Sequence, residues 1–124
     1  MPIYKLKYFA NRGRAEPSRL VFAAAGVEYE DIRFDPEQWQ SEKESVSASG
    51  KYPFGQMPVL EVDGEVIAQS QAIARYLANE FELAGKTNLD KAKVDMVVDA
   101  LEDINKGLIE MWYAEDETRQ VCHI

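Results

Sequence analysis

Three short stretches of the sequence carry residue types that could bind or activate a small molecule. The first is Tyr8-Phe9, at the end of a predicted strand and shortly before Gly13-Arg14. A phenol is a hydrogen-bond donor at neutral pH, and a donor to a substrate thiolate lowers the pKa of that thiol. A nearby cation such as Arg14 acts in the same direction. The other interpretation of Tyr8 is an aromatic side chain that packs at the edge of the core, and the residues alone leave both open.

The second stretch is Met57-Pro58, directly before another predicted strand. Proline is tolerated at the start of a strand. A cis Met57-Pro58 bond there would turn the backbone of Met57 outward, where it could pair with a ligand's peptide group as an added strand does. The alternative is a trans proline in an ordinary loop.

The third stretch is Gln69-Ser70, at the predicted start of a helix. The free N–H groups and the positive dipole end of a helix N-terminus suit a carboxylate. The Ser70 hydroxyl and the Gln69 amide would add donors at the same point. A serine in this position also caps the helix, and capping alone would explain it.

Other reactive residue types are few. Cys122 is the single cysteine, so the sequence has no Cys-x-x-C pair for dithiol redox chemistry, and His123 has no Cys or His partner at metal-ligand spacing. We therefore expect no metal. One side of the last predicted helix carries an acidic stripe of Asp95, Asp99, Glu102 and Asp103. The stripe fits a solvated face. The alternative is acids at a subunit interface, or acids that reach a ligand of the partner.

Hydrophobic alternation, helical spacing and turn residues predict the elements that position these stretches. The first half is predicted as a strand over 3–9, a helix over 15–25 ended by Gly26, a strand over 27–34 and a short helix from Pro36 that Asp35 caps. The second half is predicted as a hairpin of strands 59–62 and 65–68 with its turn at Asp63-Gly64, a helix over 71–81 that Ser70 caps, and an amphipathic helix from Leu89 to about Ala114. The order β-α-β-α-β-β-α, followed by a longer helix, is the thioredoxin arrangement with a mixed sheet.

The composition is that of an acidic globular protein. With 14 basic and 22 acidic residues the net charge is −8. Nucleic acids and anionic membranes both attract basic surfaces, so neither is an expected partner. We find no basic-then-apolar leader and no apolar run of the roughly 18–20 residues that span a bilayer. A single cysteine forms no internal disulfide, which favours a reducing compartment. The prediction is a soluble, cytoplasmic protein.

Three segments resemble the glutathione S-transferases, and the sigma class with its prostaglandin D synthases in particular: YKLKYFANRGRAEPSRLVFAAAGVEYED, PFGQMPVLEVDG and QSQAIARYLANEFELAGKT. The resemblance covers residues from about 1 to about 115. It implies a thioredoxin-like domain over 1–84 that binds glutathione as co-substrate. It also implies that 85–124 is the start of an all-helical C-terminal domain, which supplies most of the electrophile pocket, and that the protein is a cytosolic dimer.

The resemblance also implies a role for individual residues around the glutathione thiol. Tyr8 is similar to the catalytic tyrosine that stabilises the glutathione thiolate, with Phe9 and Arg14 beside it. The segment that pairs with the cysteinyl backbone is Gly55, Gln56 and Met57, ahead of a cis Pro58.

The two ends of glutathione have their own implied binding residues. Trp39 and Lys43 resemble the side chains that hold the glycine end. Gln69 and Ser70 resemble those that hold the γ-glutamyl end. Asp103 is similar to the aspartate that reaches across the dimer to the glutathione of the other subunit.

The implied activity is transfer of glutathione to small electrophiles in detoxification, with prostaglandin isomerisation and peroxide reduction as further activities of the class. The sequence departs from the family in a longer loop over 44–55, which adds Lys51 and Tyr52, and in a helical domain that we expect to be truncated. The alternative is therefore a non-catalytic, crystallin-like protein that binds glutathione. With either function, we expect the protein to form a homodimer, or a heterodimer with a full-length subunit.

Overall fold

The computed structural model describes residues 2–45 and 50–113. The chain divides into two compact units, Met1–Leu83 and Ala84–Ile124, which are described separately. The predicted loop over 44–55 lies partly outside the described residues, and Cys122 and His123 lie wholly outside them.

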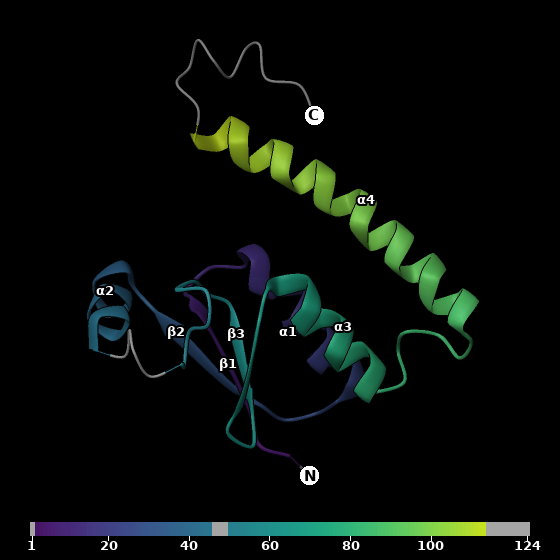
Figure 1. The fold of residues 1–124 in the computed structure, drawn as a ribbon, viewed down its shortest axis with the longest axis horizontal. Helices are drawn as coiled ribbons and strands as arrows, with labels where there is room; N and C mark the ends of the chain where they lie inside the picture. Colours follow the sequence, from purple (N-terminus) through teal and green to yellow (C-terminus); the bar gives the residue numbers. More distant parts are fainter. Residues whose placement is uncertain (1, 46–49, 114–124) are drawn as a thin grey trace. The chain divides into compact units, whose positions relative to one another are not determined.

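The first unit is built on a four-stranded mixed sheet (Figure 1). Its strands are β1 (Tyr4–Phe9), β2 (Glu30–Phe34), β3 (Val59–Val62) and β4 (Glu65–Ala68), in the spatial order β2-β1-β3-β4. Strand β1 pairs parallel with β2 and antiparallel with β3, and β3 pairs antiparallel with β4. The parallel pair needs a crossover, which α1 (Glu16–Ala25) supplies. The predicted thioredoxin-like α/β fold is confirmed.

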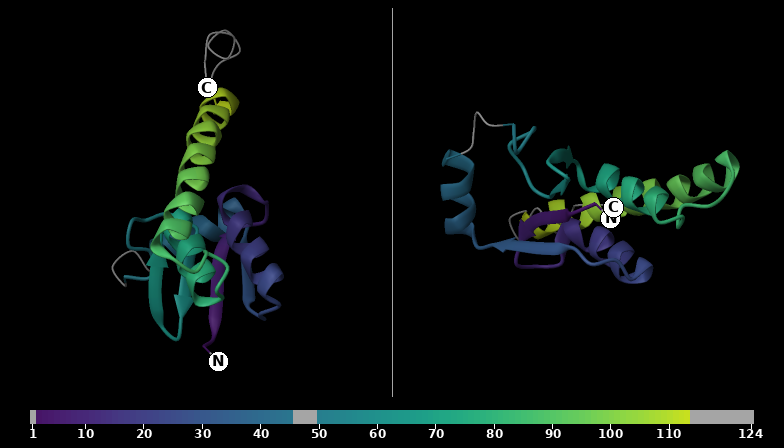
Figure 2. Two further views of the ribbon diagram at one scale, coloured as in Figure 1. Left: turned by 90° about the vertical axis from the view of Figure 1, so that its right-hand side faces the viewer. Right: turned by 90° about the horizontal axis from the view of Figure 1, so that it is seen from below.

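Two helices, α1 and α3 (Ser70–Glu80), lie together on one side of this sheet (Figure 1 and Figure 2). Because side chains alternate along a strand, every second residue of β1 faces them. The core on this side comprises Tyr4, Leu6, Tyr8, Ala15, Phe22, Leu60, Ile73 and Leu77. Phe22 is its centre, since its ring meets Tyr4 edge-on at 5.4 Å between centroids and stacks on Tyr29 at 4.1 Å.

The other face of the sheet holds a buried ion pair. Lys7 is only 8% exposed, and its Nζ lies 2.9 Å from Glu61 Oε1 on the neighbouring strand β3. The ring of Tyr52 covers the pair, with Lys7 Nζ 5.7 Å from the ring centroid. Helix α2 (Pro36–Ser45) follows β2 and also contributes to this side through Trp39, whose ring contacts Tyr52. The sheet therefore has an apolar face and a face organised by charge.

Local hydrogen bonds explain where several elements begin. Asp35 caps α2 as predicted: its carboxylate accepts from the Gln38 N–H at 2.8 Å, and the Gln38 side chain accepts from the Asp35 N–H at 2.9 Å. This is a reciprocal capping box. Strand β2, by contrast, starts at Glu30 rather than at Val27. Val27 N–H instead donates to Phe22 O at 3.2 Å and closes the C-terminus of α1 behind Gly26, whose φ is 68°.

The second unit contains α4 (Asn88–Tyr113), which has 26 residues. Thr87 and Asp90 cap its start reciprocally, at 3.1 and 3.3 Å. The N–H groups of Thr87 and Lys86 hold the pKa of Asp90 below its ordinary value. A group of apolar side chains along α4 is about half exposed: Val97, Leu101, Ile104 and Leu108. Within residues 2–45 and 50–113, no helix has the length and apolar character needed to cross a bilayer.

We predict that Phe22→Ala destabilises the protein by about 3–5 kcal/mol, because it empties the centre of a fully packed cluster. That loss approaches the whole stability of a small domain. Urea denaturation followed by circular dichroism measures it. Leu20→Ala is the matched control in the same helix: Leu20 is 60% exposed, so the free energy of unfolding should change by less than about 0.5 kcal/mol. Equal losses in the two variants would contradict this assignment of the core.

Candidate functional site

The strand register brings the three stretches singled out in the sequence to one edge of the sheet. Lys7 of β1 is paired with Val59 of β3, and Val59 is paired with Ala68 of β4. The next residue outward from each of these is Tyr8, Pro58 and Gln69, respectively. A strand end, a loop before a strand and a helix start therefore meet at the carboxyl end of β1, although they are far apart in the sequence.

Tyr8 lies at this edge with its ring in the core and its hydroxyl against the following turn. The residue is 9% exposed, and its hydroxyl oxygen accepts a hydrogen bond from the main-chain N–H of Arg14 at 3.1 Å. The resemblance implied a contact between Arg14 and Tyr8, and the structure makes it through the backbone. An oxygen that accepts from an N–H still has its own proton to donate, and cooperativity makes it a stronger donor.

Gly13 lets the chain pass close to the phenol. It has φ +39° at the start of the 3₁₀ turn η1 (Gly13–Ala15), and a Cβ at this position would collide with the Tyr8 hydroxyl. The position requires a left-handed φ and leaves no space for a Cβ, and only glycine meets both requirements.

Arg19, which was not among the predicted site residues, fixes the loop between Phe9 and η1. The side chain is 6% exposed, and its guanidinium donates to Asn11 O at 2.6 Å and to Phe9 O at 3.4 Å. It also pairs with Asp31 at 3.3 Å and lies 5.9 Å from the Tyr8 ring centroid. The sequence signal that could have identified Arg19 is its position on the same side of the helix as Phe22. That side faces the core, where a charged side chain is buried only when it has partners.

The Met57-Pro58 peptide bond is cis, as the resemblance implied. Pro58 is buried, and the Met57 side chain packs against the core, whereas Gln56 is exposed. Gly55 precedes this segment with φ +65°, and its N–H donates to Tyr52 O at 2.9 Å. A tight turn thus leads into the segment predicted to pair with a peptide ligand.

Helix α2 brings Trp39 and Lys43 toward the same region. The Trp39 ring centroid lies 6.2 Å from that of Phe9, at the end of β1, and 4.9 Å from that of Tyr52. Lys43 is exposed, and its Cε lies 3.9 Å from where a Cβ on Gly55 would be. Two segments that the resemblance assigned to one ligand therefore lie side by side.

The predicted capping role of Ser70 is wrong. Helix α3 starts one residue earlier than expected, so Ser70 is its first residue and Gln69 occupies the N-cap position without a side-chain capping bond. The reason is the backbone of Gln69, which has φ 75° and ψ 119° and whose carbonyl accepts the helical bond from Ile73 N–H at 3.0 Å. Gln69 is exposed and Ser70 is half-buried.

The remaining predicted residue, Asp103, is an exposed side chain of α4 in the second unit, and its role stays a prediction. In the part of the chain that the structure describes, no three His, Cys, Asp or Glu side chains cluster as metal ligands would.

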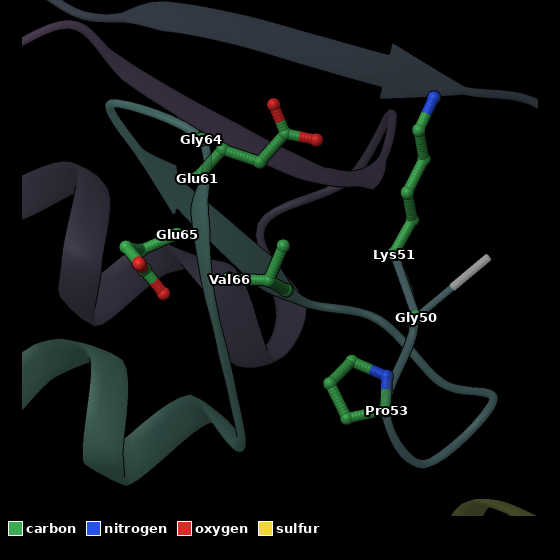
Figure 3. A pocket seen from close by; sticks show the side chains of 7 residues that line it. All are labelled: Gly50, Lys51, Pro53, Glu61, Gly64, Glu65 and Val66. Atoms are coloured by element: carbon green, nitrogen blue, oxygen red, sulfur yellow. The ribbon is translucent and has the colours of Figure 1, made fainter.

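A depression of about 510 Å³ lies between the β3–β4 hairpin and residues 50–53 (Figure 3). It is lined by Gly50, Lys51, Pro53, Glu61, Gly64, Glu65 and Val66, so it includes none of the predicted site residues.

Comparison with known proteins gives a consistent result. Residues 4–79 match the family model of the glutathione S-transferase N-terminal domain. The chain is 49% identical to probable glutathione S-transferase 5 of Caenorhabditis elegans over 92% of this chain and 53% of that protein. It is 50% identical to hematopoietic prostaglandin D synthase of Gallus gallus over 83% of this chain and 49% of that protein. A crystal structure of a nematode C. elegans specific GST superposes with a TM-score of 0.84 at 45% identity, covering 95% of this chain and 58% of that one. The chain spans about half the length of the curated relatives that it matches.

We predict that Gly13→Ala displaces the turn from Tyr8. The left-handed backbone costs about 1 kcal/mol, and the collision with the phenol adds to it, for a total of about 2–4 kcal/mol. Urea denaturation gives the stability, and the NMR chemical shift of the Arg14 N–H reports the bond to Tyr8.

Gly26→Ala is the control for this prediction. Gly26 also has a positive φ, but no atom lies within 4 Å of an added Cβ. That variant should therefore lose only the backbone contribution and keep the Arg14 shift. The steric part of the prediction is refuted if the two variants behave alike.

Proposed function

Because the chain belongs to the glutathione S-transferase family, we propose that it binds glutathione at the sheet edge where Tyr8, Pro58 and Gln69 meet. We further propose that Tyr8 stabilises the glutathione thiolate for transfer to a small electrophile. The observation that carries the proposal is the Tyr8 hydroxyl at this edge, which accepts from Arg14 N–H and so keeps its own proton available to donate. The sequence relatives of this chain that are named above are a transferase and a prostaglandin D synthase. A non-catalytic, crystallin-like role is therefore not favoured.

The energy available from this arrangement matches the chemistry. Lowering the thiol pKa by two units takes about 2.7 kcal/mol of differential stabilisation. A hydrogen bond to a charged group contributes about 1.5–3 kcal/mol, and the bond from Arg14 N–H strengthens the phenol as a donor. The thiolate then forms a C–S bond with its electron pair, while the electrophilic carbon releases its leaving group or passes the electrons to a conjugated acceptor.

The other proposed contacts follow the shape of the tripeptide. The backbone of Met57 would pair with the cysteinyl residue, as an added strand pairs with a sheet edge. The N-terminus of α3, with Gln69 and Ser70, would bind the γ-glutamyl carboxylate, since free N–H groups and the helix dipole favour an anion. Lys43 would bind the glycine carboxylate, with Trp39 beside it.

Several finer assignments are part of the same proposal. Similarity to prostaglandin D synthases supports a sigma-class protein, in which prostaglandin isomerisation or peroxide reduction accompanies detoxification. We propose a cytoplasmic protein that acts as a dimer, either with a second copy or with a full-length subunit, in which Asp103 reaches the glutathione of the other subunit. Sedimentation of the wild-type chain tests the dimer, and the affinity for glutathione with and without Asp103→Ala tests the role of Asp103.

We predict that Tyr8→Phe leaves glutathione affinity within about threefold but raises the pKa of the bound thiol by one to two units. Loss of one charge-assisted bond then lowers turnover at pH 7 by about 10- to 100-fold. Calorimetry gives the affinity, and the ultraviolet absorbance of the thiolate, followed against pH, gives the pKa.

Tyr76→Phe, on α3, is the control and should match the wild-type chain in both measurements. An unchanged thiol pKa in Tyr8→Phe would refute the role of Tyr8. If the wild-type chain binds no glutathione, the function itself is wrong. Binding without turnover by the wild-type chain would leave the glutathione site intact and remove the transferase activity from the proposal.

A further inference from the structure

Helix α2 has very little apolar surface with which to pack. Its sequence is PEQWQSEKES, so Trp39 is its only large apolar side chain. Of the α2 side chains described, over 36–44, only those of Trp39 and Glu42 are even partly buried. A helix that is polar on nearly all sides gains little from the hydrophobic effect and depends on specific contacts. What holds α2 in place therefore has to act through these two residues.

Tyr52 contacts both of them. Its ring meets the Trp39 ring edge-on, with centroids 4.9 Å apart, and its hydroxyl donates to Glu42 Oε1 at 3.1 Å. Burial, together with the carboxylates of Glu42 and Glu61, raises the pKa of Tyr52, so the phenol keeps its proton and remains a donor at neutral pH. One side chain outside the helix thus holds its inward face.

Tyr52 is itself anchored on the sheet. It is 9% exposed and lies over Lys7 of β1, whose ammonium group is 5.7 Å from the ring centroid. Lys7 is in turn held by Glu61 of β3 at 2.9 Å. A cation over an aromatic face is attracted to it, more strongly when both are desolvated.

The same residue begins the turn that leads to the cis proline. Tyr52 O accepts from Gly55 N–H at 2.9 Å, and Gly55 lies next to the aliphatic part of Lys43. Gln56 and Met57 follow directly. Tyr52 therefore links both segments proposed to bind glutathione, α2 and residues 55–58, to the central strands.

We propose that Tyr52 is a positioning residue that holds α2, and with it Trp39 and Lys43, in the orientation that binds the glycine end of glutathione. This inference rests on the proposed function. Tyr52 and Tyr8 have different roles, because Tyr52 acts on the position of α2 and Tyr8 acts on the thiol. Its loss should weaken binding of glutathione without slowing the chemical step.

The test uses Tyr52→Phe, which removes only the hydroxyl, and Tyr52→Leu, which also removes the ring contacts. We expect KM for glutathione to rise about 3- to 10-fold in Tyr52→Phe and more than about 10-fold in Tyr52→Leu, with kcat within twofold of the wild-type value. Hydrogen exchange of the α2 amides should accelerate by similar factors, while exchange in α1 stays unchanged. Tyr29→Phe, on the opposite face of the sheet, is the matched control and should change neither measurement.

A double-mutant cycle separates the contact from general loosening. Glu42→Gln keeps an acceptor for the phenol and should raise KM less than Glu42→Ala does. Tyr52→Phe combined with Glu42→Ala should be no worse than Glu42→Ala alone, because both remove one hydrogen bond. Fully additive effects would overturn the role of this bond.

The remaining outcomes are distinct. Unchanged α2 exchange in Tyr52→Leu would overturn the positioning role, and so would faster exchange with an unchanged KM for glutathione. A fall in kcat at constant KM would assign Tyr52 to the chemical step instead and overturn the inference. Failure of the wild-type chain to bind glutathione would overturn the proposed function first and this inference with it. The two failures can be distinguished, because failure of the proposed function appears in the wild-type chain and failure of the Tyr52 role appears only in the variants.

Discussion

The register of β1, β3 and β4 is the constraint on which the rest of this structure depends. Lys7, Val59 and Ala68 are paired across three strands, and this alignment alone brings Tyr8, Pro58 and Gln69 to one edge. Side chains alternate with a period of two, so a slip of one residue would exchange the two faces of β1. Tyr8 would leave the apolar core and Lys7 would enter it. The position of the phenol and the pairing of Lys7 with Glu61 are therefore specified by the same alternation.

Among the described residues, two cations are buried, Arg19 of α1 on the side of the apolar core and Lys7 on the other face of the sheet, and each supports a different part of the candidate site. Arg19 packs beneath Tyr8 and fastens the loop through Asn11 O and Phe9 O. Lys7 lies on the opposite face beneath Tyr52 and is paired with Glu61. Buried ion pairs add little net stability, because desolvation offsets most of their attraction. Their effect here is geometric, since the groups that they hold are those at which ligand contacts are proposed.

The parts of the fold that were predictable from sequence are those with local chemical causes. The β3–β4 hairpin was predicted with its observed bounds because Asp63-Gly64 adopts the positive φ angles that a two-residue turn needs. The backbone details at the ends of helices and strands were not predictable in this way. Nothing local in the sequence indicates that Val27 closes α1, that Arg14 reaches Tyr8 through its backbone, or that Gln69 rather than Ser70 precedes α3. For the site, the resemblance supplied the residues, and the register explains why most of them meet.

The two ends of the candidate site differ in what supports them. The proposed thiol end rests on β1, whose Tyr8 ring belongs to the packed core and whose following loop is fixed by a buried guanidinium. The proposed glycine end rests on α2, a polar helix whose Trp39 and Glu42 contact Tyr52. Segments with few buried apolar contacts open at a lower free-energy cost than the core does. Changes that loosen α2 should therefore act on ligand affinity, whereas changes beneath Tyr8 should act on the reactivity of the bound thiol.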